Sequence, residues 1–253
     1  MTRPARQISP SGLYHIMFRG MSRCHIFEES EDFEKLLALI SLTKAELQYK
    51  LLGFCLLDNH AHLIIQEENP GDITMAMRKV LGPYANWFNR KYFRSGALLA
   101  NRYRSECIID ERYLFALIRY VHQNPLVAGI AKELKEYKWS SYKEYVSQQE
   151  VYADISYVLD LFSPDRKAAV ETFIEFHKVD TNFSHSLMDK PKKTKNDIQH
   201  EIQSILNGKE LCDLGGLPRQ ERNDILVMMK KHGLSIRQIE RMTGISRGIV
   251  ARA

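Results

Sequence analysis

The chain has 253 residues, more than an average domain needs, which favours a main domain with a smaller additional module. Hydrophobic residues make up 44% and charged residues 26% of the sequence, as in soluble globular proteins, and no apolar run of about 18 residues predicts a membrane span. The polar N-terminus, MTRPARQISPSG, lacks the apolar stretch of a secretory signal. Four widely spaced cysteines form no CxxC pair, so we expect a cytoplasmic protein with neither a zinc site of that type nor a disulfide framework.

The net charge of +5 is unevenly distributed. Residues 190–253 contain 13 Lys and Arg against 7 Asp and Glu, whereas residues 1–189 contain 23 against 24. A basic excess in the last quarter is typical of an appended nucleic-acid-binding module, although a solvated basic surface would have the same composition.

The first part of the chain predicts alternating strands and helices. Apolar alternation at 13–18 predicts a strand, and Ser30 is expected to cap the helix that follows it. Segments 50–57 and 60–66 predict a hairpin closed by Asp58 and Asn59. A helix at about 73–92 and a short strand at 104–109 precede a helix that Asp110 caps and that is expected to end at Asn124–Pro125.

This order, β-α-β-β-α-β with a further helix, is the split βαβ pattern of ferredoxin-like domains. We therefore predict an α+β fold, an antiparallel sheet with helices on one face, over residues 8–150. Short helices are expected to extend it over 151–178. The polar and basic segment 179–195 is expected to be a linker.

Residues 196–253 are expected to form an all-helical module with a helix-turn-helix. Ser235 and Ser246 are the predicted caps, Gly244 closes the first helix, and a small core is expected from Leu234, Ile236, Ile239, Met242 and Ile245. The predicted DNA contacts are Arg237, Arg241 and Arg247, with Arg252 also on the recognition helix. An ordinary helical hairpin is the alternative. Because the chain ends at Ala253, at or within the recognition helix, a truncated module is a second alternative to a complete one.

His60 and His62 lie two residues apart on a predicted strand, so their side chains share one face. Two imidazoles on one face can hold a divalent metal ion. A surface pair at the end of a hairpin would have the same spacing, so this motif alone leaves both interpretations open.

Tyr120 and Asn124 lie four residues apart on a predicted helix and therefore share a face. The amide oxygen of Asn124 could supply a third, hard ligand suited to Mg²⁺ or Mn²⁺. A core tyrosine and a helix C-cap are the structural alternatives. His122 is another candidate ligand, but it lies about 200° around the helix from Tyr120.

A basic segment with aromatic residues precedes the last predicted strand. Its cations are Arg90, Lys91, Arg94, Arg102 and Arg104, interleaved with Tyr92, Phe93 and Tyr103. This composition favours a track for a DNA backbone with aromatic rings for base stacking, against a solvated turn.

Taken together, the His60-Ala-His62 motif, RYVHQNPLVAGI around Tyr120, and WSSYKEY resemble the single-tyrosine HUH transposases, most closely the REP-associated tyrosine transposases. The segments YHIMFRGMSRCHIF and GALLANRYRSECI support the resemblance, which covers about residues 8–178. The family's usual Pro-Asn-His run is Asp58-Asn59-His60 here. Arg19 and His15 also match family positions, with His15 either a core or a second-shell histidine.

The resemblance implies a metal-dependent endonuclease and strand transferase acting on single-stranded hairpin or repeat DNA. His60, His62 and Asn124 would hold Mg²⁺ or Mn²⁺, and Tyr120 would form a 5′-phosphotyrosine. Tyr113, seven residues earlier on the same helix face, is the rival nucleophile.

Several features are left open by the resemblance. Related enzymes work as dimers that exchange catalytic helices, whereas some domesticated relatives act alone, so a homodimer is one of two expected states. A cytoplasmic, nucleoid-associated location is expected. The alternative functions are a replication initiator or relaxase of the same chemistry, and a catalytically silent DNA-binding regulator.

Overall fold

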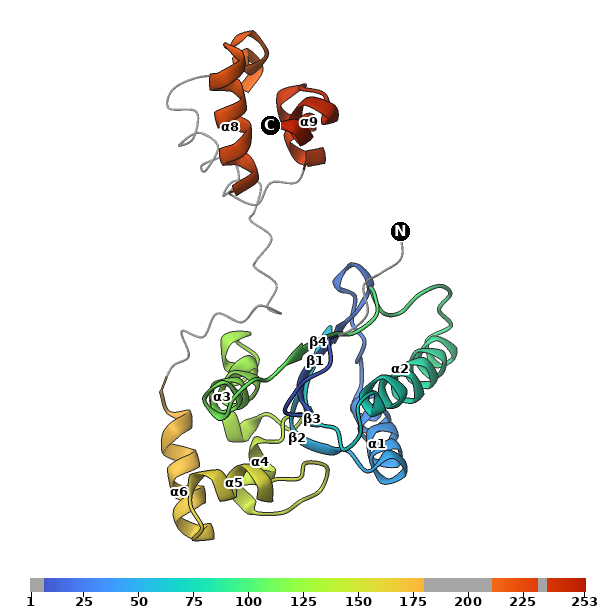
Figure 1. Ribbon diagram of the computed structural model, residues 1–253. Coiled ribbons are helices and arrows are strands. Elements are labelled where there is room, and N and C mark those ends of the chain that lie inside the picture. Colours follow the sequence, from blue (N-terminus) through green and yellow to red (C-terminus); the bar gives the residue numbers. More distant parts are fainter. Residues whose placement is uncertain (1–6, 180–210, 232–235) are drawn as a thin grey trace. The chain divides into compact units, whose positions relative to one another are not determined.

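The computed structural model describes residues 7–179, 211–231 and 236–253. The chain divides into two compact units, Met1–Leu187 and Met188–Ala253 (Figure 1). The division falls inside the segment 179–195 that was expected to be a linker; apart from Val179, that segment and residues 196–210 lie outside the described residues. None of the described helices is both long enough and apolar enough to cross a membrane.

The first unit is built on a four-stranded antiparallel sheet. Its strands are β1 (Leu13–Arg19), β2 (Lys50–Leu57), β3 (His60–Gln66) and β4 (Arg104–Cys107), in the order β2-β3-β1-β4. Strand β1 therefore lies between β3 and β4, and every pair is antiparallel. This order is the split βαβ arrangement, so the predicted α+β, ferredoxin-like fold class is confirmed.

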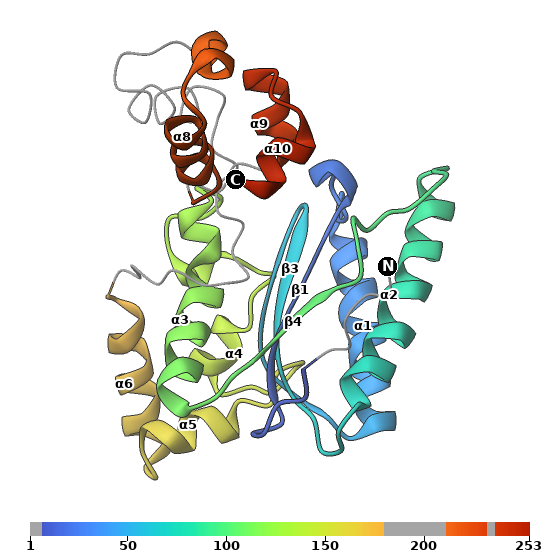
Figure 2. The same cartoon turned by 45° about the horizontal axis from the view of Figure 1, so that its top comes forward.

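Helices α1 (Ser30–Leu47) and α2 (Asp72–Lys91) pack against each other on one face of the sheet. Helix α3 (Glu111–Val127) contacts β2 and β3 from the opposite side (Figures 1 and 2). The sequence analysis expected the helices on one face only. That prediction is wrong, because helices cover both faces. The reason is that β1, β2 and β3 are buried on both faces, so each face needs a helical cover.

The start of α1 also differs from the expectation that Ser30 is its cap. The N-cap is Glu29, whose side chain accepts from the backbone of Asp32 while the Asp32 carboxylate accepts from the Glu29 N–H at 3.0 Å. This reciprocal capping box satisfies donors that the helix itself leaves without partners.

The free edge of β2 is covered by the segment that follows α3. This segment contains the 3₁₀ turn Leu134–Glu136, α4 (Tyr142–Ser147), α5 (Ser156–Phe162) and α6 (Arg166–His177). The Leu56 N–H donates to the Trp139 carbonyl at 2.9 Å, and the Ser141 N–H donates to the Phe54 carbonyl at 3.0 Å. Backbone groups that an edge strand would otherwise expose are therefore paired.

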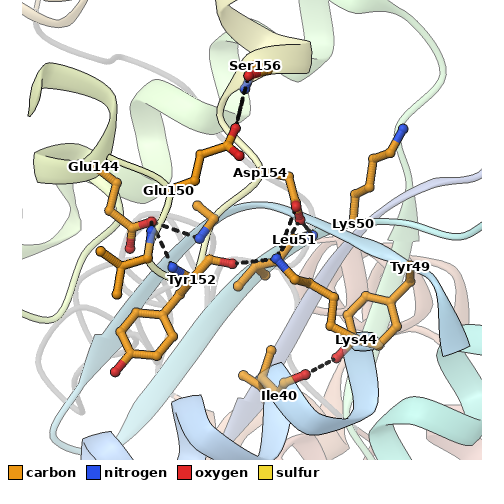
Figure 3. A network of polar contacts seen from close by, with 12 residues as sticks. Ile40, Lys44, Tyr49, Lys50, Leu51, Glu144, Glu150, Tyr152, Asp154 and Ser156 are labelled. Carbon is orange, nitrogen blue, oxygen red and sulfur yellow. Dashed lines mark hydrogen bonds and ion pairs between the residues drawn. The ribbon is translucent and has the colours of Figure 1, made fainter. Parts of the chain in front are cut away.

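Two carboxylates fasten the loop after α4 to this edge (Figure 3). The Asp154 carboxylate accepts from the Leu51 N–H at 2.8 Å and from Lys44 Nζ at 3.0 Å. The Glu144 carboxylate accepts from three consecutive backbone N–H groups, residues 151–153, at 2.8–3.0 Å. The loop is held as a rigid cover because its backbone donors end on charged acceptors.

We expect Asp154→Ala to lower the free energy of unfolding by about 1–3 kcal/mol, since it leaves the Leu51 N–H without its acceptor and removes the carboxylate that pairs with Lys44. Urea unfolding followed by circular dichroism measures this. The matched control is Glu34→Ala, which breaks the more exposed Glu34–Lys138 pair and should cost less than about 1 kcal/mol. Equal costs for the two variants would contradict a fastening role for Asp154.

The second unit contains the 3₁₀ turn Leu211–Gly216, α8 (Arg219–Lys231), α9 (Ile236–Thr243) and α10 (Arg247–Arg252). Its core consists of Leu214, Ile225, Leu226, Met229, Ile239, Ile245 and Val250. Gly244, at φ 71°, makes the turn between α9 and α10. Of the expected core residues, Ile239 and Ile245 are buried and Met242 packs against them, but Ile236 is 38% exposed because it begins α9; Leu234 and the expected cap Ser235 lie outside the described residues.

Candidate active site

The face of the sheet that α3 covers is polar at its centre. His60 lies opposite Arg19, and His62 lies opposite Met17. Directly opposed residues of antiparallel strands share a face, and His15, two residues before Met17, shares it too. The register of two strands thus brings three histidines and an arginine from distant parts of the sequence onto one surface.

The three histidine rings form a contiguous cluster. His15 Nε2 lies 2.9 Å from His62 Nδ1, with the rings stacked at a centroid distance of 5.1 Å. The His60 ring lies edge-on to the His62 ring, also at 5.1 Å, and its Nδ1 lies 2.6 Å from Asn59 Oδ1. The amide oxygen can only accept, so His60 Nδ1 is the donor. Both rings are therefore held through Nδ1, and Nε2 is the nitrogen that each would offer to a metal ion.

Burial lowers the pKa of His60 to about 4, and the positive charge of Arg19 acts in the same direction. His60 is neutral at physiological pH as a result. Neutral imidazole is the form that binds metal ions.

Tyr120 comes to this cluster from α3. Its ring lies edge-on to His62, with centroids 5.6 Å apart, and its side chain is 7% exposed. Burial raises the pKa of Tyr120, whereas a side-chain hydrogen bond with Asn124 acts in the opposite direction. Helix α3 begins at the predicted N-cap, Asp110, whose carboxylate accepts from the Tyr113 N–H at 2.7 Å. A phenol and the His-x-His pair therefore lie side by side within one chain.

Helix α3 was predicted to end at Asn124–Pro125. It instead continues to Val127. Pro125 has no N–H for the Val121 carbonyl. The Asn124 side-chain amide lies there instead, with Nδ2 donating to the Tyr120 carbonyl at 2.8 Å and located 3.5 Å from the Val121 carbonyl. These bonds orient the amide nitrogen toward the helix, which leaves Oδ1 as the atom suited to bind a cation.

The rival residues lie elsewhere. Burial and a hydrogen bond with Glu106 raise the pKa of Tyr113, so its hydroxyl is engaged by a carboxylate that would repel a phosphate. Tyr103 is buried, with its hydroxyl 3.5 Å from Thr74 on α2. His122 is 1% exposed, and its two ring nitrogens contact His177 and Ser141 at 3.0 and 2.8 Å, which excludes it as a ligand in this arrangement.

Within the described ranges, no group of three or more His, Cys, Asp or Glu residues could hold a metal ion. The candidate ligand set is of another kind, since it combines two imidazoles with one amide oxygen. Neutral His60, the pre-oriented His62 ring and the Asn124 oxygen fit a divalent cation that takes mixed nitrogen and oxygen ligands and completes its shell with phosphate oxygens.

The cations that were predicted to contact DNA differ in their exposure and in whether acidic side chains neutralise them. Arg90 and Arg94 are exposed at and beyond the end of α2, and Arg104 lies opposite Met17 on the face of the histidines. Arg102 lines a cavity of about 520 Å³ between α2 and residues 97–103. Lys91 instead forms ion pairs with Glu29, Glu31 and Asp32, at 3.6, 2.7 and 2.7 Å, so its charge is largely compensated within the protein.

In the second unit, Arg247 is exposed and forms an ion pair with Glu240. Arg237 and Arg241 belong to α9, but their side chains lie outside the described ones. The three residues thus lie on two short helices joined by the Gly244 turn.

Sequence reasoning missed a turn beside the site. After β1, the turn Met21–Arg23 contains Ser22 at φ 53° and Arg23 at φ 65°, both in the left-handed region that side chains rarely adopt. A Cβ on Gly20 would lie 2.1 Å from the Cys24 carbonyl, so this tight turn requires glycine there. Burial and the charges of Arg23 and Arg104 lower the pKa of Arg19, which places these cations near one another. The run Gly-Met-Ser-Arg gives no recognisable signal of this geometry.

A second histidine pair holds α3 in place. His122 Nδ1 lies 3.0 Å from His177 Nε2 on α6, and His177 Nδ1 lies 2.8 Å from the Phe173 carbonyl. The Gln123 amide donates to the His177 carbonyl at 2.9 Å. Adjacent residues of α3 therefore anchor the helix to α6 while Tyr120 faces the sheet.

This pair should make the domain sensitive to acid. Burial lowers the pKa of His177 from 6.5 to about 4 and that of His122 well below 6.5. The unfolded chain takes up protons below pH 6.5 that the folded chain refuses, so stability is complete above that pH and falls as the pH drops toward 4. His177 alone should cost about 2 kcal/mol between pH 7.5 and pH 5.

Urea unfolding of the wild type and His177→Gln at both pH values tests this. The variant should lose less stability on acidification than the wild type, although it is less stable at pH 7.5. If the wild type and His177→Gln lost equal stability between the two pH values, His177 would not be a residue that takes up a proton on unfolding.

Comparison with known proteins gives a family match over the part of the chain that contains this site. Residues 9–124 match the family of IS200-like transposases. That segment contains the whole sheet, His60, His62, Tyr120 and Asn124. Over this segment the chain is similar to that family of transposases.

The predicted resemblance to REP-associated tyrosine transposases is also confirmed. A Haemophilus influenzae (strain Rd) protein described as a REP-associated tyrosine transposase is 20% identical over 166 residues, which cover 61% of this chain and 92% of the relative. A solved REP-associated tyrosine transposase, bound to a REP hairpin, superposes with a TM-score of 0.50 at 14% identity, covering 74% of this chain and 99% of that one. At this identity the second likeness concerns the fold.

Proposed function

We propose that this protein is a metal-dependent endonuclease and strand transferase that cuts single-stranded DNA with Tyr120 as the nucleophile. The supporting observation is the position of the Tyr120 ring, edge-on to His62 at 5.6 Å, on a face that also presents His60. A hydrolytic nuclease would need a positioned water instead of a phenol at this place.

The proposed ligands for Mg²⁺ or Mn²⁺ are His60 Nε2, His62 Nε2 and Asn124 Oδ1. A bound divalent cation would act as a Lewis acid on the scissile phosphate. His15 and Asn59 hold the two imidazoles in the required orientation, as second-shell partners commonly do. Arg19, opposite His60, would lie close enough to bind a non-bridging phosphate oxygen.

In the proposed reaction Tyr120 Oη attacks phosphorus and the bond to the 3′ oxygen breaks. The proton that Tyr120 loses is balanced by the one that the leaving 3′ oxygen takes up. The products are a 5′-phosphotyrosine and a free 3′-hydroxyl, so the phosphodiester energy is retained. Attack by a 3′-hydroxyl on the phosphotyrosine then joins the strand and restores Tyr120.

Burial raises the pKa of Tyr120, which disfavours phenolate in the absence of substrate. We infer that the nucleophile becomes competent only when positive charge assembles around it, from the bound cation and Arg19. Such a requirement would restrict cutting to complexes in which the strand is correctly placed.

The proposed substrate is single-stranded DNA that carries a hairpin or repeat, and the solved relative bound to a REP hairpin supports this choice. We propose that the second unit contacts duplex or hairpin DNA through α10, where Arg247 is exposed. Arg90, Arg94, Arg102 and Arg104 would bind the strand itself. Such a substrate would place the enzyme at the bacterial chromosome in the cytoplasm.

A cleavage assay tests the proposal. Hairpin oligonucleotides with single-stranded flanks, labelled at the 3′ end, are incubated with the protein and Mg²⁺ or Mn²⁺ and resolved on a denaturing gel. We expect the label to migrate with the protein, because the 5′-phosphate side becomes covalently bound, and EDTA should abolish the band. Hydrolysis without an adduct would overturn the tyrosine mechanism, and tight binding without cutting would favour a regulator.

A further inference from the structure

Phe93 is almost fully exposed to solvent, so it does not contribute to the core. It exposes 98% of its side chain, more than any other large hydrophobic residue in the part of the chain that the structure describes. Its backbone is also in the left-handed region, at φ 51°. An aromatic residue at positive φ is a conformational outlier, and such strain tends to collect at functional sites.

Hydrogen bonds on either side hold Phe93 in this conformation. The Tyr92 hydroxyl donates to the Asp32 carboxylate at 2.8 Å, and the Arg94 N–H donates to the Asn89 carbonyl at 2.8 Å. The Asn89 side chain donates to the Gly96 carbonyl at 2.9 Å. The ring is therefore presented to solvent by a fixed backbone.

The loop that contains Phe93 is joined to the catalytic end of the sheet. The Met21 N–H donates to the Leu98 carbonyl at 2.8 Å, and the Ala100 N–H donates to the Arg19 carbonyl at 2.9 Å. Arg19 is the strand partner of His60. An occupant of the Phe93 surface would thus lie at the same end of the sheet as the proposed cleavage site.

The charge around Phe93 indicates what that occupant is. Arg90 and Arg94 flank it and are exposed, and Arg94 Nη2 lies 3.6 Å from Cys24 Sγ, beside the turn that presents Arg23. An exposed apolar ring flanked by arginines fits a single nucleic-acid strand, which offers stacking faces and phosphates together. It does not fit an apolar protein partner, which would have to bury several arginines.

We infer that Phe93 stacks on one base of the substrate strand beside the cleavage site, with Arg94 and Arg23 on the adjoining phosphates. This inference rests on the proposed function. Of the three aromatic residues that the sequence places in this segment, only Phe93 is available for stacking. Tyr92 is bonded to Asp32, and Tyr103 is 9% exposed. The stacked base would hold the strand in place without reading its sequence.

Binding assays with a stacking reporter test this inference. The probe is a hairpin oligonucleotide with a single-stranded thymidine tail that carries one 2-aminopurine, moved along the tail in successive probes. Wild-type protein should quench the fluorescence at one tail position. Phe93→Ala should remove that quenching and weaken binding about 5- to 150-fold, whereas Phe93→Trp should retain both.

The matched control is Ile109→Ala, which removes another exposed apolar side chain, 74% exposed, beyond β4. It should change neither quenching nor affinity. Arg94→Gln should reduce the slope of log affinity against log salt by about one, whereas Phe93→Ala should leave the slope unchanged, because stacking releases no counterions. Phe93→Gly should raise the melting temperature, since glycine adopts positive φ without strain.

Equal quenching and affinity in the wild type and Phe93→Ala would overturn the inference. Failure of the proposed function is distinguishable from this result. If the wild type forms no covalent adduct but loses quenching on Phe93→Ala, the stacking site stands and the nuclease does not. If the adduct forms and Phe93→Ala binds normally, the opposite holds.

Discussion

Replacing Tyr120 with phenylalanine should abolish the covalent protein–DNA band while leaving hairpin binding intact. The ring stays, so its edge-on contact with His62 stays, and only the attacking oxygen is removed. Loss of the single nucleophile of a covalent mechanism should reduce strand cleavage by about 10³-fold or more. The measurement is a denaturing gel of labelled hairpin DNA, with fluorescence anisotropy for the binding.

Tyr113→Phe is the matched control, since Tyr113 lies on the same helix and its hydroxyl is bonded to Glu106. This variant should still form the adduct. An adduct that survives in Tyr120→Phe but vanishes in Tyr113→Phe would transfer the nucleophile to Tyr113. Metal-dependent cutting that survives in both variants would instead point to water.

His60→Ala and His62→Ala should each lower metal-dependent cleavage by about 10²–10³-fold, because the transition-state phosphate loses much of its electrostatic stabilisation. Each variant should also bind Mn²⁺ more weakly, which electron paramagnetic resonance of free Mn²⁺ measures directly. His62→Ala should be the less stable protein, since it removes the 2.9 Å contact that the buried His15 makes with His62.

His25→Ala is the matched control for these two variants, because His25 is exposed and contacts only Glu28 at 3.4 Å among the hydrogen bonds of the described residues. It should bind Mn²⁺ and cut DNA as the wild type does. Unchanged Mn²⁺ affinity in both His60→Ala and His62→Ala would remove the proposed metal site, whatever their activity.

The sequence was sufficient to predict the strands of the sheet and the histidines that share one of its faces. Alternation and turn chemistry located β1, β2 and β3, and the spacing of His60 and His62 placed both on one face. Helical periodicity placed Tyr120 and Asn124 together. These features depend on neighbours within a few residues, which is the range over which local patterns are informative.

Features that depend on contacts between distant segments could not be predicted. The pairing of His15 with His62 follows from strand register, and the neutralisation of Lys91 follows from the packing of α2 on α1. The position of α3 on the second face of the sheet required knowledge of which apolar surfaces remain uncovered. The left-handed backbone of Phe93 is imposed by bonds on either side of it and has no signature in the residue itself.

Pro125 has a consequence for the Asn124 side chain. A residue with an N–H at 125 would donate that N–H to the Val121 carbonyl. Because proline has none, this carbonyl stays available to Asn124 Nδ2, which lies 3.5 Å from it and also donates to the Tyr120 carbonyl at 2.8 Å, so the amide oxygen is directed away from both. A residue that never touches substrate thus favours one rotamer of the neighbouring side chain. The entropy cost of aligning the ligand oxygen is therefore incurred during folding and not at each binding event.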